Sequence, residues 1–181
     1  MTPKLHSDVR LQQIKWKDLL VLSRKEIAYE ILLSLPWLIG SLIFAYYSWY
    51  MPALICSFFF FLTGLRQSHN AQHNTVGISK RATEWFLFGL SATMLASMHA
   101  VKYNHLQHHK HPLTTEDIEA MSARMPWWKA FLAGPYFILR IHQHAMKYAN
   151  KHLKQWILFE IILITLILLF TYFIIDIHWI T

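Results

Sequence analysis

A long uncharged stretch near the start of the chain constrains the fold more than any other feature. From Ile31 to Leu65, no charged side chain interrupts thirty-five residues. One helix of that length would reach roughly 52 Å, whereas the hydrocarbon core of a bilayer is about 30 Å thick. The middle of the stretch reads YYSWYMP, with aromatic residues typical of the lipid–water interface and a proline that suits a turn or a helix start. The sequence therefore predicts a helical hairpin at 31–65.

Two further apolar segments decide the topology. The first, residues 156–175, is interrupted by Glu160 alone and is long enough to cross a bilayer once, as part of a predicted span at 155–177. The second, residues 85–98, falls short of the about 17 residues that a span needs, which favours a helix lying at the interface. We therefore predict an all-α integral membrane bundle with about three transmembrane helices, a hairpin plus one.

Composition and charge agree with this class of protein. Of 181 residues, 55% are hydrophobic and 15% are aromatic, and the mean hydropathy is +0.27. All 17 Lys and Arg residues lie before the hairpin or between Arg66 and Lys154. The positive-inside rule places these segments on the cytoplasmic side of the membrane, which would be the inner membrane if the source is bacterial. The same loops account for the net charge of +7, so no nucleic-acid partner is needed to explain it.

The chain is predicted to form one membrane domain, residues 1–181, in four parts. Residues 1–28 form a basic leader at the interface or, as an alternative, a solvated helix; they lack the pattern of a cleaved signal. The hairpin at 31–65 follows, then a cytoplasmic or interfacial region at 66–154 and the third span at 155–177. The single cysteine, Cys56, excludes a disulfide and a cysteine-ligated metal site within the chain. Ten of the 12 histidines lie between 69 and 152, which places the chemistry in the third part.

Two histidine clusters have the spacing of metal ligands. His69 and His73, the first box, are i,i+4 on a helix, and His105 stands three and four residues before His108 and His109, which complete the second box. If residues 85–98 lie flat, both boxes share one membrane face and can converge. Imidazole suits iron, zinc, copper and nickel, so these ligands alone do not identify the metal. The absence of paired Glu-x-x-His motifs excludes a ferritin-like carboxylate cage.

The chain resembles the membrane fatty acid desaturase and hydroxylase superfamily over nearly its whole length. The resemblance is carried by the sequences around the boxes, SHNAQHN, MHAVKYNHLQHHKHPLTTEDIEA and RMPWWKAFLAGP. The resemblance implies a cytoplasmic centre of two iron ions that uses dioxygen to oxidise the acyl chain of a membrane lipid. It implies an electron donor such as ferredoxin, rubredoxin or a cytochrome. Ligand roles then fall to the five box histidines.

One feature of the superfamily is missing: a third H-x-x-H-H box after a further pair of spans. Five box histidines are fewer than two irons require in that family, and we therefore expect a C-terminally incomplete or split enzyme, whose activity as this chain alone stays open. The alternative is that other residues complete the ligand set or orient it by hydrogen bonds: His99, His142, His144, His152, Asn70 and Asn74.

Two other functions compete with the desaturase interpretation. A b-type cytochrome would place haem between histidines on neighbouring spans, but the boxes here lie at span ends. A non-enzymatic remnant would be inactive, or would act only when joined by a partner chain that carries the remaining box. Among the acidic residues, Glu116, Asp117 and Glu119 are expected to form a solvated face, and Glu160 is expected to snorkel to the interface.

Overall fold

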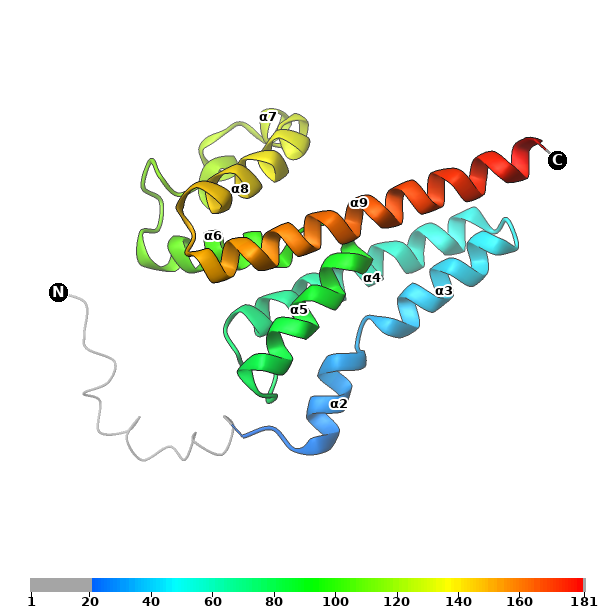
Figure 1. Cartoon of the computed structure of the whole chain (residues 1–181), viewed down its shortest axis with the longest axis horizontal. Helices are drawn as coiled ribbons and strands as arrows, with labels where there is room; N and C mark the ends of the chain where they lie inside the picture. The colour runs from blue at the N-terminus through cyan, green and yellow to red at the C-terminus, as the bar shows by residue number, and fades with distance from the viewer. Residues whose placement is uncertain (1–20, 181) are drawn as a thin grey trace.

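The computed structural model describes the backbone of residues 21–180 and the side chains of residues 21–174, so most of the predicted basic leader lies outside the described residues. Every regular element in this part of the chain is a helix, which confirms the all-α prediction there (Figure 1). The elements are α2 (Arg24–Leu32), α3 (Leu35–Tyr46), α4 (Tyr50–Gln72), α5 (Lys80–Met94), α6 (Met98–Lys110), the 3-10 helix η3 (Glu119–Arg124), α7 (Trp127–Leu132), α8 (Gly134–Tyr148) and α9 (Lys151–Ile180).

Helices α3 and α4 run side by side and are joined by a short turn within the aromatic YYSWYMP segment (Figure 1). Small residues let the two helices approach closely. A Cβ added to Gly40 would lie 3.2 Å from the Cys56 Sγ, and the hydroxyls of Ser41 and Ser57 share a hydrogen bond of 2.6 Å. Close packing of small side chains and interhelical hydrogen bonds are the contacts that hold helices together in lipid, where apolar burial gives no driving force.

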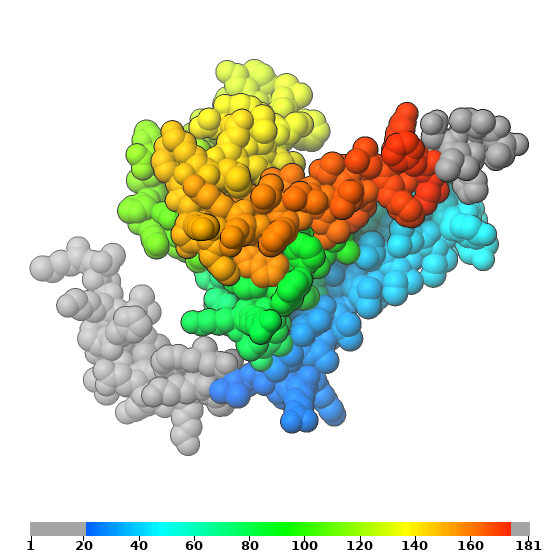
Figure 2. Space-filling model, in the orientation of Figure 1, coloured from blue at the N-terminus to red at the C-terminus, as the bar shows by residue number. Residues whose placement is uncertain are grey.

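Two stretches are long and apolar enough to cross a membrane: Arg24–Tyr46, which comprises α2, α3 and the turn between them, and Lys151–Ile174 in α9. The α3–α4 hairpin and the C-terminal part of α9 project to the same side of the molecule (Figures 1 and 2). Their outer faces expose large apolar side chains, for example Phe58, Phe61 and Phe170. Exposed apolar side chains gathered on one part of a surface are typical of contact with lipid or a partner.

The packed core lies at the opposite end, where the end of α4 and the start of α9 meet α5, α6 and α8. One buried cluster joins α4, α5 and the start of α6 through Ala71, Leu87 and Met98. A second joins α6, α8 and α9 through Ala100, Ile141 and Ile157. Helix α6 therefore takes part in both clusters and fixes the second histidine box relative to the first.

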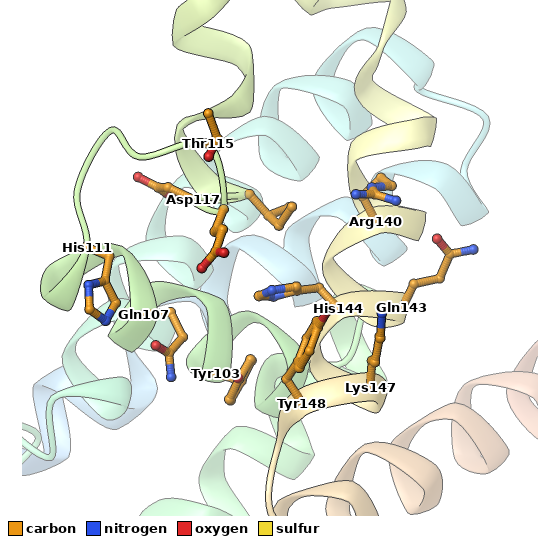
Figure 3. Close-up of a pocket in the computed structure, with 12 residues that line it drawn as sticks. Tyr103, Gln107, His111, Thr115, Asp117, Arg140, Gln143, His144, Lys147 and Tyr148 are labelled. Carbon is orange, nitrogen blue, oxygen red and sulfur yellow. The ribbon is translucent and has the colours of Figure 1, made fainter.

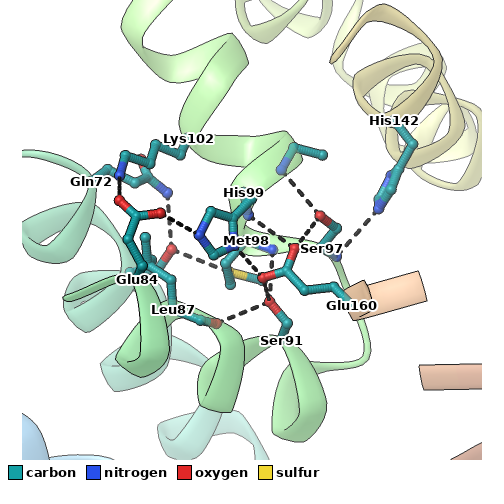
Figure 4. A network of polar contacts seen from close by, with 12 residues as sticks. Gln72, Glu84, Leu87, Ser91, Ser97, Met98, His99, Lys102, His142 and Glu160 are labelled. Carbon is teal, nitrogen blue, oxygen red and sulfur yellow. Dashed lines mark hydrogen bonds and ion pairs between the residues drawn. The ribbon is translucent and has the colours of Figure 1, made fainter. Parts of the chain in front are cut away.

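A buried polar network ties α9 to α5 and α6 (Figure 4). The imidazole of His99 is fully buried between two carboxylates, with Nδ1 2.5 Å from Glu160 Oε1 and Nε2 2.6 Å from Glu84 Oε2. The Lys102 ammonium donates to the other Glu84 oxygen at 2.5 Å. One face of the His99 ring stacks on Trp156 with the ring centroids 5.0 Å apart. Two cationic groups and two carboxylates thus balance one another inside the core.

The prediction that Glu160 snorkels to the interface is wrong. Its side chain is fully buried and accepts hydrogen bonds from the hydroxyls of Ser91 and Ser97 as well as contacting His99. Buried carboxylates are stable when they are paired and their remaining lone pairs accept hydrogen bonds. Glu160 lies near the start of α9, from which its side chain could reach water if that side of the helix were free. Helices α5 and α6 pack over this side instead.

This network predicts a pH dependence of stability. Burial acts to lower the pKa of His99, but its hydrogen bonds to Glu160 and Glu84 raise it overall, and the hydrogen bond from His99 is the main reason that the pKa of Glu84 falls to about 2. The His99 contribution is therefore complete below its ordinary pKa of 6.5 and is lost as the pH rises through the folded-state value. The Glu84 contribution is present above its ordinary pKa of 4.5 and is lost as the pH falls toward about 2.

Denaturant unfolding of the detergent-solubilised chain across a pH series measures this effect. We expect the free energy of unfolding to decline above pH 6.5, and the His99→Gln variant, which cannot carry the charge, to lose that part of the decline. An alkaline decline of the same size in both proteins would show that other groups cause it.

Candidate metal centre

The two histidine boxes meet in one cluster between the end of α4 and the last two turns of α6. We call His69, His73, His105 and His109 the histidine cluster; their neighbouring ring centroids lie 4.5 to 5.0 Å apart. Nε2 of His105 lies 2.9 Å from Nε2 of His73 and 3.1 Å from Nε2 of His109. The ligand atoms of His69, His73 and His105 all lie within 4.8 Å of one another.

Local structure explains how the boxes reach the same place. Helix α4 ends at the first box: His73 is its C-cap, and Asn74 turns the chain away with a left-handed φ of 56°. Helix α6 starts at the Ser97 N-cap, so that the second box lies in its last two turns. Helices α4 and α6 contact each other next to the cluster, where the Ser68 hydroxyl lies 3.1 Å from Met98 Sδ.

Glu119 fixes the tautomer of the His105 ring. Its two carboxylate oxygens lie 3.0 and 3.1 Å from Nδ1 of His105. A carboxylate accepts hydrogen bonds and cannot donate them, so Nδ1 carries the proton and Nε2 of the neutral ring presents its lone pair to the cluster. This carboxylate–histidine pair is the arrangement that orients histidine ligands at metal centres.

Asp117 has the same relation to His108, the fifth box histidine. Its Oδ2 accepts from His108 Nδ1 at 2.7 Å and from the backbone amide of Leu113 at 2.8 Å, while Oδ1 accepts from the amide of Ala120. His108 lies further out than the cluster, with its ring centroid 6.5 Å from that of His105. The expectation of a solvated acidic face is therefore wrong for Asp117, which is buried, and for Glu119, which pairs with a box histidine.

The protonation of two box histidines departs from the ordinary in opposite directions. Burial, followed by the neighbouring imidazoles of His105, His69 and His109, lowers the pKa of His73 and favours the neutral ring that a metal requires. The hydrogen bond to Asp117 is the main cause that raises the pKa of His108. A metal at His108 must displace a proton, so its affinity there increases with pH.

The Glu119–His105 pair gives a direct prediction. Glu119→Gln removes the carboxylate that fixes the His105 tautomer, and loss of such a partner lowers metal affinity by about 10- to 100-fold. Titration of the purified chain with Fe(II) or Zn(II) measures the change. Ser122→Ala, an exposed position in the same short helix, is the matched control and should bind as the wild type does. Equal affinity in both variants would contradict the role of Glu119.

The cluster fits a metal ion in its donor chemistry. A histidine nitrogen lies about 2.0 to 2.1 Å from a bound zinc ion, and two such ligands at octahedral or tetrahedral angles are about 2.8 to 3.4 Å apart. The 2.9 and 3.1 Å separations in the cluster lie within that range. His69 and His109 are exposed, so the cluster is open on one side.

Two of the additional ligand candidates have both ring nitrogens engaged elsewhere. His99 is held between Glu84 and Glu160. His142 donates from Nδ1 to the Ile138 carbonyl at 2.8 Å, and its Nε2 accepts from the backbone amide of Ser97 at 3.2 Å (Figure 4). Neither ring has a lone pair left for a metal, so each has a structural role in this arrangement.

The remaining candidates lie outside the cluster. His144 contacts Asn104 and lines a separate cavity, and His152 is exposed near the start of α9 with its ring 6.5 Å from that of Trp156. Asn70 follows a box histidine but donates to Glu30 Oε1 at 2.6 Å, an interaction that anchors α2 to α4. Asn74 forms the turn after α4.

Comparisons of the chain with protein-family models, with curated proteins and with solved structures found no match.

Proposed function

We propose that this protein is a membrane-bound, histidine-ligated iron oxidoreductase of the fatty acid desaturase type, acting on the acyl chain of a membrane lipid. The observation that carries the proposal is the convergence of both boxes in one cluster, with Nε2 atoms 2.9 and 3.1 Å apart. Surface histidines without a shared ligand repel one another once they are protonated. Nothing would then favour an arrangement in which the same ring nitrogen of each points toward one position.

The proposed membrane arrangement has three spans. Arg24–Tyr46 and Lys151–Ile174 are two of them, and α4 is the third, because it packs along α3 and its part from residue 50 to 65 has no charge. Helix α5, with 15 residues, is too short to cross and lies among the packed helices near the cluster. The cluster then lies at the cytoplasmic membrane surface, where an acyl chain can reach it from the bilayer.

Each box residue has a defined task in this proposal. His69, His73, His105, His108 and His109 would hold the iron; Glu119 and Asp117 orient His105 and His108 by accepting from Nδ1. Iron, when bound, supplies the dioxygen-dependent oxidation of an unactivated C–H bond. Removal of two hydrogens with reduction of dioxygen to two waters needs two electrons and two protons, so an electron donor such as ferredoxin, rubredoxin or a cytochrome is part of the proposal.

The ring spacing favours this centre over a b-type cytochrome. A haem plane must pass between its two axial histidines, and Nε2 atoms 2.9 Å apart leave no space for it. A second arrangement is favoured by the open side of the cluster: His69 and His109 are exposed, and a partner chain can supply ligands there. That arrangement would catalyse the same oxidation of an acyl chain but needs two polypeptides.

Metal and product analysis of the full chain tests the proposal. The chain is produced in a host without desaturases, purified anaerobically in detergent and loaded with Fe(II), and its iron content is measured by mass spectrometry. Two irons per chain support a complete centre, whereas a lower content that rises to two with a partner protein supports the two-chain arrangement. Failure to retain iron, zinc or any other transition metal would overturn the proposal.

Lipid analysis of the host tests the reaction. We expect new unsaturated or hydroxylated acyl chains with the wild type and none with His105→Ala. His152→Ala is the matched control, because it removes an exposed histidine outside the cluster. Identical lipid profiles for the wild type and His105→Ala, with iron bound to the wild type and with a suitable electron donor present, would exclude acyl oxidation.

A further inference from the structure

A cavity of about 660 Å³ lies between α6, the segment that follows it and α8, apart from the histidine cluster (Figure 3). Tyr103 and Gln107 line it from α6 at i,i+4 spacing, and His111 lines it from the C-cap of that helix. The cluster residues His105 and His109 belong to another face of the same helix. The cavity is therefore a second site that shares α6 with the first.

Asn104 fixes the tautomer of His144 in the wall of this cavity. The Asn104 amide nitrogen donates to the carbonyls of Ala100 and Ile141 at 2.8 and 3.0 Å, so its Oδ1 is an acceptor. Nδ1 of His144 lies 2.8 Å from that oxygen and must donate to it. The other nitrogen of the neutral ring, Nε2, then carries a lone pair that can accept a hydrogen bond. In Figure 3 the His144 ring points into the cavity.

Arg140, His144 and Lys147 share one face of α8, and all three line the cavity. Burial is the main cause that lowers the pKa of His144, and the charges of Arg140 and Lys147 lower it further, whereas Glu116 acts in the opposite direction. The ring is therefore neutral at pH 7 and acts as an acceptor. Asp117 also lines the cavity, but both of its oxygens already accept hydrogen bonds.

The lining thus offers two kinds of partner in one cavity. Arg140 and Lys147 attract an anion and have the donors for its oxygens. Glu116 and Nε2 of His144 attract a group that carries N–H or O–H donors. The Lys147 ammonium lies 4.9 Å from the centroid of the Tyr148 ring, a cation–π contact that holds it at the cavity wall. A simple anion would use only the cationic part of the lining, whereas a ligand with both charges uses the acceptors as well.

We propose that this cavity binds a phosphoethanolamine group, with the phosphate at Arg140 and Lys147 and the ammonium at Glu116 and His144 Nε2. The group can come from the headgroup of a membrane lipid or from the free phosphate ester. The site does not depend on a metal in the histidine cluster. Phosphocholine has the same charges but no N–H donor, so it cannot donate a hydrogen bond to the His144 lone pair or to the carboxylate.

Binding of the two free esters to the full chain in detergent tests the recognition. We expect O-phosphoethanolamine to bind at least about tenfold more tightly than phosphocholine, and Arg140→Gln and Glu116→Gln each to weaken its binding by about tenfold. Arg81→Gln removes an exposed arginine at the start of α5 and is the matched control. Calorimetry measures affinity, and thermal unfolding verifies that each variant is folded.

Reconstitution separates the two sources. In nanodiscs made of phosphatidylcholine, added phosphatidylethanolamine competes with the free ester if the natural ligand is a lipid headgroup, and it has no effect if the site takes the free ester. Equal affinity for the two esters, no binding of either, or wild-type affinity in both cavity variants would overturn the proposal. His105→Ala should bind the ester normally, so that this outcome is independent of the iron centre.

Discussion

His105→Ala is expected to lose metal almost completely, with affinity reduced by more than the about 100-fold that loss of an orienting partner costs. His105 occupies the centre of the cluster: it lies 2.9 Å from His73, 3.1 Å from His109, and its ring is 4.7 Å from that of His69. It is also buried and oriented by Glu119. Removing it deletes the lone pair that the other rings surround.

Metal content of the purified variants, measured by mass spectrometry after Fe(II) loading, checks this result. His69→Ala should have a smaller effect, because His69 is exposed and its loss can be offset by water. His152→Ala should retain the wild-type metal content. Normal metal content in His105→Ala, in a protein with wild-type thermal stability, would place the metal elsewhere or exclude a metal from the cluster.

Local patterns predicted much of the fold and the centre of the site. Uncharged runs predicted the helices, and spacing of i,i+4 placed each box on one helix face, because both properties depend on neighbours in the sequence. The shortness of residues 85–98 predicted that the two boxes share a side, and α5 is a helix of 15 residues that brings them together. Three membrane crossings remain part of the proposal.

The acidic partners of the histidines were not predictable in the same way. Glu119 reaches His105 across fourteen residues and Glu160 reaches His99 across sixty-one. Such pairs depend on how α9 and η3 pack on α6, and a single sequence does not determine this packing. The only local signal was Glu160 itself, because it is an ionisable residue within an apolar run. Such residues usually have a functional or structural role.

Glu160→Ala is expected to destabilise the fold by about 3 to 5 kcal/mol, the usual cost of removing one partner of a buried ion pair. The change leaves Nδ1 of His99 and the hydroxyls of Ser91 and Ser97 without their common acceptor in the core. It also removes the polar contacts of α9 with α5 and α6, whose packing holds the second box in place. Glu160→Gln keeps the volume but not the charge, so it should lose less than Glu160→Ala.

Denaturant unfolding in detergent at pH 6 measures the difference, with Thr165→Ala as the control because that residue is exposed on the same helix. Surface changes of this kind are usually within about 0.5 kcal/mol. The double variant Glu160→Ala/His99→Ala should lose less than the sum of the single losses, because the first substitution already removes the partner of the second. Additive losses would mean that Glu160 and His99 stabilise the core separately, and the cavity left by each side chain, rather than their pairing, would then account for the cost.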